Sequence, residues 1–165
     1  MRKIIISIVL LVILIAGFFV AFWPKQQSIT IMIYATDLGI SDKNFTDYVT
    51  SNPGTHIFYF YSVDDDNCDY VNNTILKSLA ENLLTERLDN MILVDLSKAS
   101  TTAKAKFYRQ WGFTQYPAFA IIESDLNDYK VISSLGYSEE KPFNTDDVKE
   151  WLIDNEIWQA WLASN

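Results

Sequence analysis

Hydrophobic residues follow one another without interruption near the start of the chain. Residues 4–23 are all apolar or small. At 1.5 Å per residue, about twenty helical residues reach the roughly 30 Å of a bilayer's hydrocarbon core. Arg2 and Lys3 precede the run, and positively charged flanks of this kind stay in the cytoplasm. The pattern therefore predicts one transmembrane helix with a cytoplasmic N-terminus.

A cleaved signal peptide is the alternative interpretation of this segment. Its apolar region would be shorter and would end in small residues, whereas Phe22 and Trp23 are bulky at the candidate cleavage sites. The sequence favours an uncleaved anchor over residues 1–23, a polar stalk over residues 24–28 and a domain over residues 29–165. This arrangement predicts a single-pass protein of the plasma membrane with an extracytoplasmic domain.

Strand-like and helix-like patterns alternate beyond the stalk. Strands are predicted at residues 29–34, 57–61, 91–96, 118–122 and 129–133. Helices are predicted from four apolar faces: Phe45, Tyr48 and Val49, with Ser41 as the cap; the leucine-rich residues 74–88; Ala103, Phe107 and Trp111; and a closing helix with Val148, Trp151, Leu152, Trp158 and Leu162. The order βαβαβαββα predicts an α/β domain, in which parallel strands joined by right-handed crossovers end in an antiparallel hairpin.

Composition excludes several classes of function. The net charge is −8 and no basic cluster is present, so we expect no nucleic-acid partner. A single cysteine, Cys68, rules out a disulfide within the chain and a zinc site of the paired-cysteine kind. The single histidine, His56, opens an apolar run and has no second histidine with which to share a metal.

The acidic cluster at residues 64–69 is the one candidate for a metal site. A calcium loop of the EF-hand type needs glycine at its sixth position and an acid at its twelfth. Counted from Asp64, these positions are Asp69 and Ile75, so the motif fails. The cluster is interpreted as a solvated loop and helix cap, and the sequence predicts no metal and no cofactor.

The stretch Trp111-Gly112 followed by Tyr116-Pro117 is the most distinctive local pattern. An aromatic residue and a glycine end a helix, and the X-Pro pair leads directly into the apolar run at residues 118–122. Proline cannot donate to a sheet ladder, so Pro117 belongs at the start of that strand. X-Pro is also the peptide at which a cis bond costs little.

With this stretch, the order of elements resembles the thioredoxin superfamily over about residues 29–162. The narrower similarity is to small membrane-anchored thioredoxin-like proteins of Gram-positive bacteria, including bacteriocin-transport accessory proteins. The resemblance implies a thioredoxin-like α/β fold, with a central mixed sheet flanked by helices. It also implies that Tyr116-Pro117 is the cis-proline pair that lies beside the active site and binds an extended peptide through its backbone.

The family's catalytic Cys-x-x-Cys pair has no full counterpart here. Counting forward from the aromatic strand puts Asp65 in the first position and Cys68 in the second, while counting backward from Ile75 puts Asp66 first and Asp69 second. In both registers an aspartate replaces the attacking cysteine. A third register makes Cys68 the attacking residue but fits the helix spacing less well. Dithiol exchange needs an attacking thiolate and a resolving partner, and one cysteine cannot be both.

Three functional hypotheses follow. The leading one is a redox-degenerate module that binds an extended peptide or partner protein through Tyr116, Pro117, Asp65 and Asp66 at the membrane surface. The second is a monothiol thiol-disulfide oxidoreductase acting through Cys68. The third, a structural appendage of a neighbouring transport or assembly system, rests on the resemblance alone.

Overall fold

The computed structural model describes residues 34–85, 88–126 and 128–164. The predicted transmembrane helix, the stalk and all of the predicted strand 29–34 except Tyr34 lie outside these residues. Within them, no helix is both long and apolar enough to cross a bilayer. The fold is therefore described for the unit that spans residues 31–165.

Five strands form one mixed sheet in the order β1-β3-β2-β4-β5. They are β1 (Ala35–Ser41), β2 (Gly54–Tyr61), β3 (Leu88–Asp95), β4 (Ala118–Ser124) and β5 (Tyr129–Gly136). β3 pairs in parallel with both β1 and β2, whereas β4 is antiparallel to both β2 and β5. The predicted mixed sheet with an antiparallel hairpin at one edge is confirmed.

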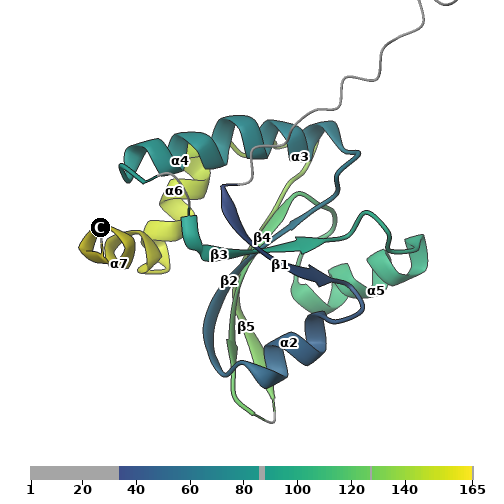
Figure 1. Cartoon of the computed structure of the whole chain (residues 1–165). Helices are drawn as coiled ribbons and strands as arrows, with labels where there is room; N and C mark the ends of the chain where they lie inside the picture. The colour runs from purple at the N-terminus through teal and green to yellow at the C-terminus, as the bar shows by residue number, and fades with distance from the viewer. Residues whose placement is uncertain (1–33, 86–87, 127, 165) are drawn as a thin grey trace, which may run out of the picture. The chain divides into compact units, whose positions relative to one another are not determined.

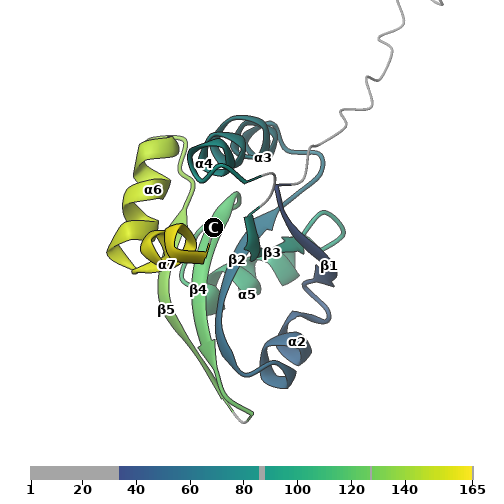
Figure 2. The ribbon, with the colours of Figure 1, turned by 60° about the vertical axis from the view of Figure 1, so that its left-hand side comes forward.

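Helices cover both faces of this sheet (Figures 1 and 2). One face carries α2 (Phe45–Ser51) and α5 (Thr101–Trp111). The other carries a continuous helical run, α3 (Asp66–Tyr70), the π-helical turn η1 (Val71–Leu76) and α4 (Lys77–Asn82), together with α6 (Thr145–Asp154) and α7 (Ile157–Ser164). The sheet thus separates two hydrophobic clusters.

Strand β2 contributes to both clusters because successive side chains point to opposite faces. Tyr59 packs with the α3–α4 and α6 side, whereas Phe58 and Phe60 pack with α2 and α5. All three side chains are fully buried. The prediction that this aromatic run is a strand buried on both faces is confirmed.

Two predicted helix boundaries are wrong at the N-terminal side. Ser41 is the last residue of β1, and Asn44 is the N-cap residue of α2 in its place. The helix predicted over residues 74–88 begins earlier, at Asp66, and its last predicted residue, Leu88, opens β3. The apolar spacing of four continues to Leu88, but parallel pairing with β1 takes that residue into the sheet.

The closing helix and one crossover also differ from the prediction. The closing helix is divided into α6 and α7 at Glu156, whose positive φ of 63° ends the first helix.

The crossover through α5 leads from β3 to β4, and β4 runs antiparallel to its neighbour β2. Alternation of β and α therefore gives parallel pairs only for β1, β2 and β3.

Candidate functional site

The site begins where β2 ends and the helical run begins. Asp65 has an extended backbone and is the N-cap residue of α3, and its Oδ1 accepts a hydrogen bond from the Cys68 N–H at 2.9 Å. Aspartate favours this position because its carboxylate satisfies a free N–H and interacts well with the helix dipole. Asp66 lies exposed in the first turn. α3 therefore begins directly after Asp65 and contains Asp66 and Cys68 in its first turn.

Cys68 is fully buried. Its Sγ accepts a hydrogen bond from the Ser62 N–H at 3.3 Å, and the Tyr59 hydroxyl donates to its carbonyl oxygen at 3.4 Å. The side chain belongs to the cluster formed by α3, η1, α4 and α6. The thiol is therefore not accessible to solvent.

The electrostatics of this environment favour the neutral thiol. Burial is the main cause that raises the pKa of Cys68 well above its ordinary value, and the carboxylates of Asp65 and Asp69 raise it further. The Ser62 N–H acts in the opposite direction but does not compensate. Since the thiolate is the attacking species in disulfide exchange, this environment disfavours nucleophilic chemistry.

The Tyr116-Pro117 peptide bond is cis. Pro117 is buried immediately before β4, and its carbonyl oxygen accepts a hydrogen bond from the Tyr137 N–H at 2.9 Å. Tyr116 is half-buried. Within the described ranges, neither the N–H nor the carbonyl of Tyr116 has a hydrogen-bond partner.

Two residues of α5 lie beside the Tyr116 side chain. Lys104 donates from Nζ to the Tyr116 hydroxyl at 3.0 Å and lies 4.7 Å from the centre of its ring. The pKa of Tyr108 is raised, first by burial and then by Tyr116, Cys68 and Asp65 in that order. Tyr108 is therefore within electrostatic reach of both halves of the site.

Sequence reasoning did not single out Lys104, Tyr108 or Ser62 as site residues. Lys104 and Tyr108 are four residues apart, so they share one face of α5. That spacing was the available signal, but the face could not be assigned to the site without the tertiary contact to Tyr116.

Metal-ligating side chains do not gather in the part of the chain that the structure describes. No group of three or more His, Cys, Asp and Glu side chains there has an arrangement that could hold a metal ion. In the acidic loop, Asp65 acts as the cap of α3.

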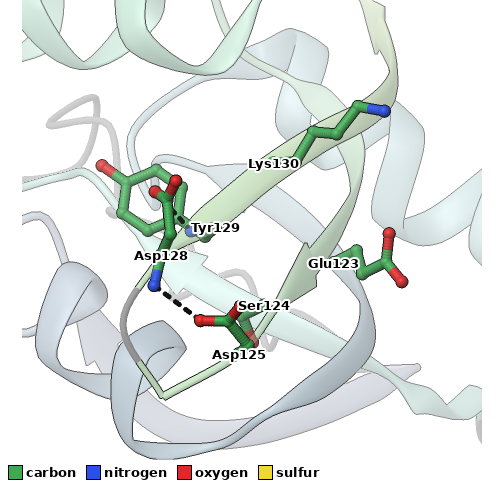
Figure 3. A pocket seen from close by; sticks show the side chains of 6 residues that line it. All are labelled: Glu123, Ser124, Asp125, Asp128, Tyr129 and Lys130. Atoms are coloured by element: carbon green, nitrogen blue, oxygen red, sulfur yellow. Dashed lines mark hydrogen bonds between the residues drawn. The ribbon is translucent and has the colours of Figure 1, made fainter.

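A separate pocket of about 220 Å³ lies at the turn of the β4–β5 hairpin. Asp125 Oδ1 accepts a hydrogen bond from the Asp128 N–H at 2.8 Å, and Glu123 and Lys130 extend away from these two residues (Figure 3). The aspartate carboxylate thus stabilises the turn itself. Nothing in this pocket adds to the site around Cys68.

Comparison with known proteins gives matches among solved structures. No protein-family model matches this chain, and no curated protein matches it. A thioredoxin of Trichomonas vaginalis matches with 17% identity and a TM-score of 0.43, covering 77% of this chain and 97% of its own. Chlamydomonas reinhardtii thioredoxin f2 matches with 13% identity and a TM-score of 0.47 over 76% and 97%. The C-terminal domain of Neisseria meningitidis DsbD, in the reduced form, matches with 13% identity and a TM-score of 0.42 over 69% and 89%.

The chain has a thioredoxin-like fold with a single cysteine. This assignment rests on the strand order, the strand directions and the flanking helices described above, and not on the matches. Since Cys68 is the only cysteine of the chain, the domain has no Cys-x-x-Cys dithiol.

Proposed function

We propose that this protein is a redox-degenerate thioredoxin-fold module that binds an extended peptide segment of a partner protein. The observation that carries the proposal is the pair Asp65 and Cys68. The carboxylate of Asp65 caps α3 at the position that the resemblance assigns to the attacking cysteine, and the thiol of Cys68 is fully buried. The fold is retained beside a site that is unsuited to disulfide exchange.

The binding edge that we propose is the backbone of Tyr116. Its N–H and carbonyl have no partner among the described residues and lie next to a buried proline that begins a strand. An extended peptide can pair with free backbone groups at such an edge, since main-chain hydrogen bonds supply affinity that is independent of sequence. The exposed Asp66 and the half-buried Asp65 would border the bound peptide.

The location of the module is also a proposal. The apolar residues 4–23, preceded by Arg2 and Lys3, support a single membrane anchor with the domain on the extracytoplasmic side. A partner would then be an exported or membrane-bound protein. The resemblance to bacteriocin-transport accessory proteins suggests a role beside an export system, for which the resemblance is the only support.

A monothiol oxidoreductase acting through Cys68 is the competing function. It requires an accessible thiolate, whereas Cys68 is fully buried and its pKa is raised. Reduction of a disulfide substrate that depends on Cys68 would establish this function and overturn our proposal. Replacement by alanine, Cys68→Ala, is expected to leave peptide binding unchanged.

Photo-crosslinking of selected peptides tests the proposed edge. Peptides selected from a random phage-displayed library against the full-length chain in detergent would be added to variants carrying benzoylphenylalanine at one position. We expect adducts when the label replaces Tyr116 and none when it replaces Leu126, which is 71% exposed on the β4–β5 hairpin. Failure to select any peptide, or equal labelling at both positions, would refute a binding edge at Tyr116.

A further inference from the structure

A second pocket, which we call the carboxylate pocket, lies at the carboxyl ends of the parallel strands. Its volume is about 300 Å³, and Asp37, Asp42, Tyr61 and Asp95 line it together with Lys43 and Lys98. Asp95 is the register partner of both Ser41 in β1 and Tyr61 in β2. The carboxyl edge of parallel strands is where open α/β sheets bind ligands.

Tyr61 contributes a phenol hydroxyl to this pocket. Its side chain is only 8% exposed and lines the pocket, and its hydroxyl is not one of the buried side-chain atoms that lack a hydrogen-bond partner. Burial, followed by the charges of Asp95 and Asp37, raises the pKa of Tyr61 to about 12, so the hydroxyl stays protonated at neutral pH. A phenol hydroxyl that lines the pocket can accept a hydrogen bond from a ligand that enters it.

The two carboxylates nearest to Tyr61 also keep binding capacity. Asp37 Oδ1 accepts from the Gly39 N–H at 2.8 Å, and Asp95 Oδ1 accepts from the N–H and the hydroxyl of Ser97. The second oxygen of each carboxylate is not used in these bonds. Neither Lys43 nor Lys98 forms an ion pair in the described ranges, where the pair found is Lys77 with Glu81.

We propose that the carboxylate pocket binds the guanidinium group of an arginine side chain. A guanidinium has five N–H donors in a planar fork, which suits two carboxylates and a phenol oxygen better than a spherical ion does. Such charge-assisted hydrogen bonds are among the strong ones. A protein of net charge −8 also attracts a cationic segment over a distance.

The proposal rests on the proposed function, because the arginine would belong to the peptide bound at Tyr116. The pocket and that site share one loop. The Val63 N–H donates to the Ser97 hydroxyl at 2.8 Å, and that hydroxyl in turn donates to Asp95. Two residues further along the chain, Asp65 caps the helix that holds Cys68. A peptide that crosses the start of α3 therefore passes beside the pocket.

Binding of small probes to the full-length chain in detergent tests the pocket directly. The probes are N-acetyl-arginine methylamide and its neutral, nearly isosteric citrulline analogue, followed by ¹⁵N NMR. We expect the arginine probe to shift the amide signals of Gly39 and Ser97 in a saturable way, and the citrulline probe to bind at least about tenfold more weakly. Equal binding of the two probes, or shifts confined to other regions, would overturn the proposal.

Two variants identify the groups involved. Asp37→Asn removes one charge from an exposed side chain of β1 and is expected to weaken the arginine probe about tenfold. Tyr61→Phe keeps the packing of the ring, removes only the hydroxyl, and should weaken the probe severalfold. Binding that is unchanged in both variants would refute the pocket. The probe is too short to pair with the Tyr116 backbone, so it can bind to the pocket even if no peptide binds at Tyr116. If selected peptides bind at Tyr116 but the probe does not bind, the pocket proposal is overturned and the proposed function stands.

Discussion

At the scale of single residues, Asp65 acts as the cap of α3. A thiolate and a carboxylate are both favoured at a helix N-terminus by the free N–H groups and the dipole. Only the thiolate can form a mixed disulfide, whereas the carboxylate accepts the Cys68 N–H and closes the first turn. Asp65 therefore stabilises the start of α3 and supplies no thiol there.

Removal of this cap should lower stability by a measurable amount. We expect Asp65→Ala to reduce the free energy of unfolding by about 0.5–2 kcal/mol, because the Cys68 N–H loses its acceptor. Asp65→Asn keeps an acceptor oxygen and should cost less. Chemical denaturation of the full-length chain in detergent measures both values. An alanine variant as stable as the parent would show that the carboxylate does not act as a cap.

The buried thiol should make stability fall in alkaline solution. Burial raises the pKa of Cys68 above its unfolded value of 9.0, so the unfolded chain loses the thiol proton first. The contribution of Cys68 is complete below about pH 9 and is lost as pH rises above it. We expect Cys68→Ala to flatten the decline that begins near pH 9, leaving the decline due to tyrosines at higher pH.

Alkylation of the same thiol provides an independent measurement. Iodoacetamide should modify Cys68 far more slowly in the native chain than in the denaturant-unfolded chain, because the side chain is fully buried. Rapid modification below neutral pH would contradict this expectation and would favour the monothiol enzyme.

At the scale of elements, strong local signals were predictable and boundaries were not. The aromatic strand β2 and the Trp111-Gly112 helix end follow from composition and spacing alone. Leu88 continues a helical spacing yet lies in β3, since pairing across the sheet overrides a local period. Ser62 and Tyr108 reach the site only through tertiary contacts, so no local pattern identified them.

Gly112, the C-cap residue of α5, is expected to tolerate substitution poorly. Its φ is +80°, and an added Cβ would lie 3.0 Å from the Ser134 Oγ, whose hydroxyl donates to the Gly112 carbonyl at 2.8 Å. We expect Gly112→Ala to cost more than the roughly 1–2 kcal/mol of a left-handed alanine.

Gly39 provides the matched control in the same denaturation experiment. Its φ is +67°, but an added Cβ would meet nothing within 4 Å. Gly39→Ala should therefore show the backbone cost alone, about 1–2 kcal/mol. A Gly39 variant that loses as much stability as the Gly112 variant would mean that the contact with Ser134 adds nothing.

At the scale of the whole molecule, one helix is bound to the sheet mainly by an aromatic cluster. The Phe45 ring in α2 lies 4.8 Å from Phe58 and 5.5 Å from Phe60 in β2. It also lies 5.3 Å from Phe107 and 4.5 Å from Trp111 in α5. The sequence predicted that Phe45 lies on the apolar face of a helix. The contact of α2 with α5 could not be predicted, because it depends on the order of the strands in the sheet. Alternation of β and α along the chain does not determine that order.

Truncation of Phe45 should therefore affect the whole domain. Because the ring is fully buried and contacts α5 and β2, Phe45→Ala is expected to cost about 3–5 kcal/mol through lost transfer free energy and a cavity. Leu162→Ala removes an apolar side chain that is 50% exposed on α7 and should cost much less. Loss of stability in the Phe45 variant should appear in one cooperative transition, because both helices pack on the same sheet. Two separate transitions, or similar losses in the two variants, would show that α2 and α5 are stabilised independently of this cluster.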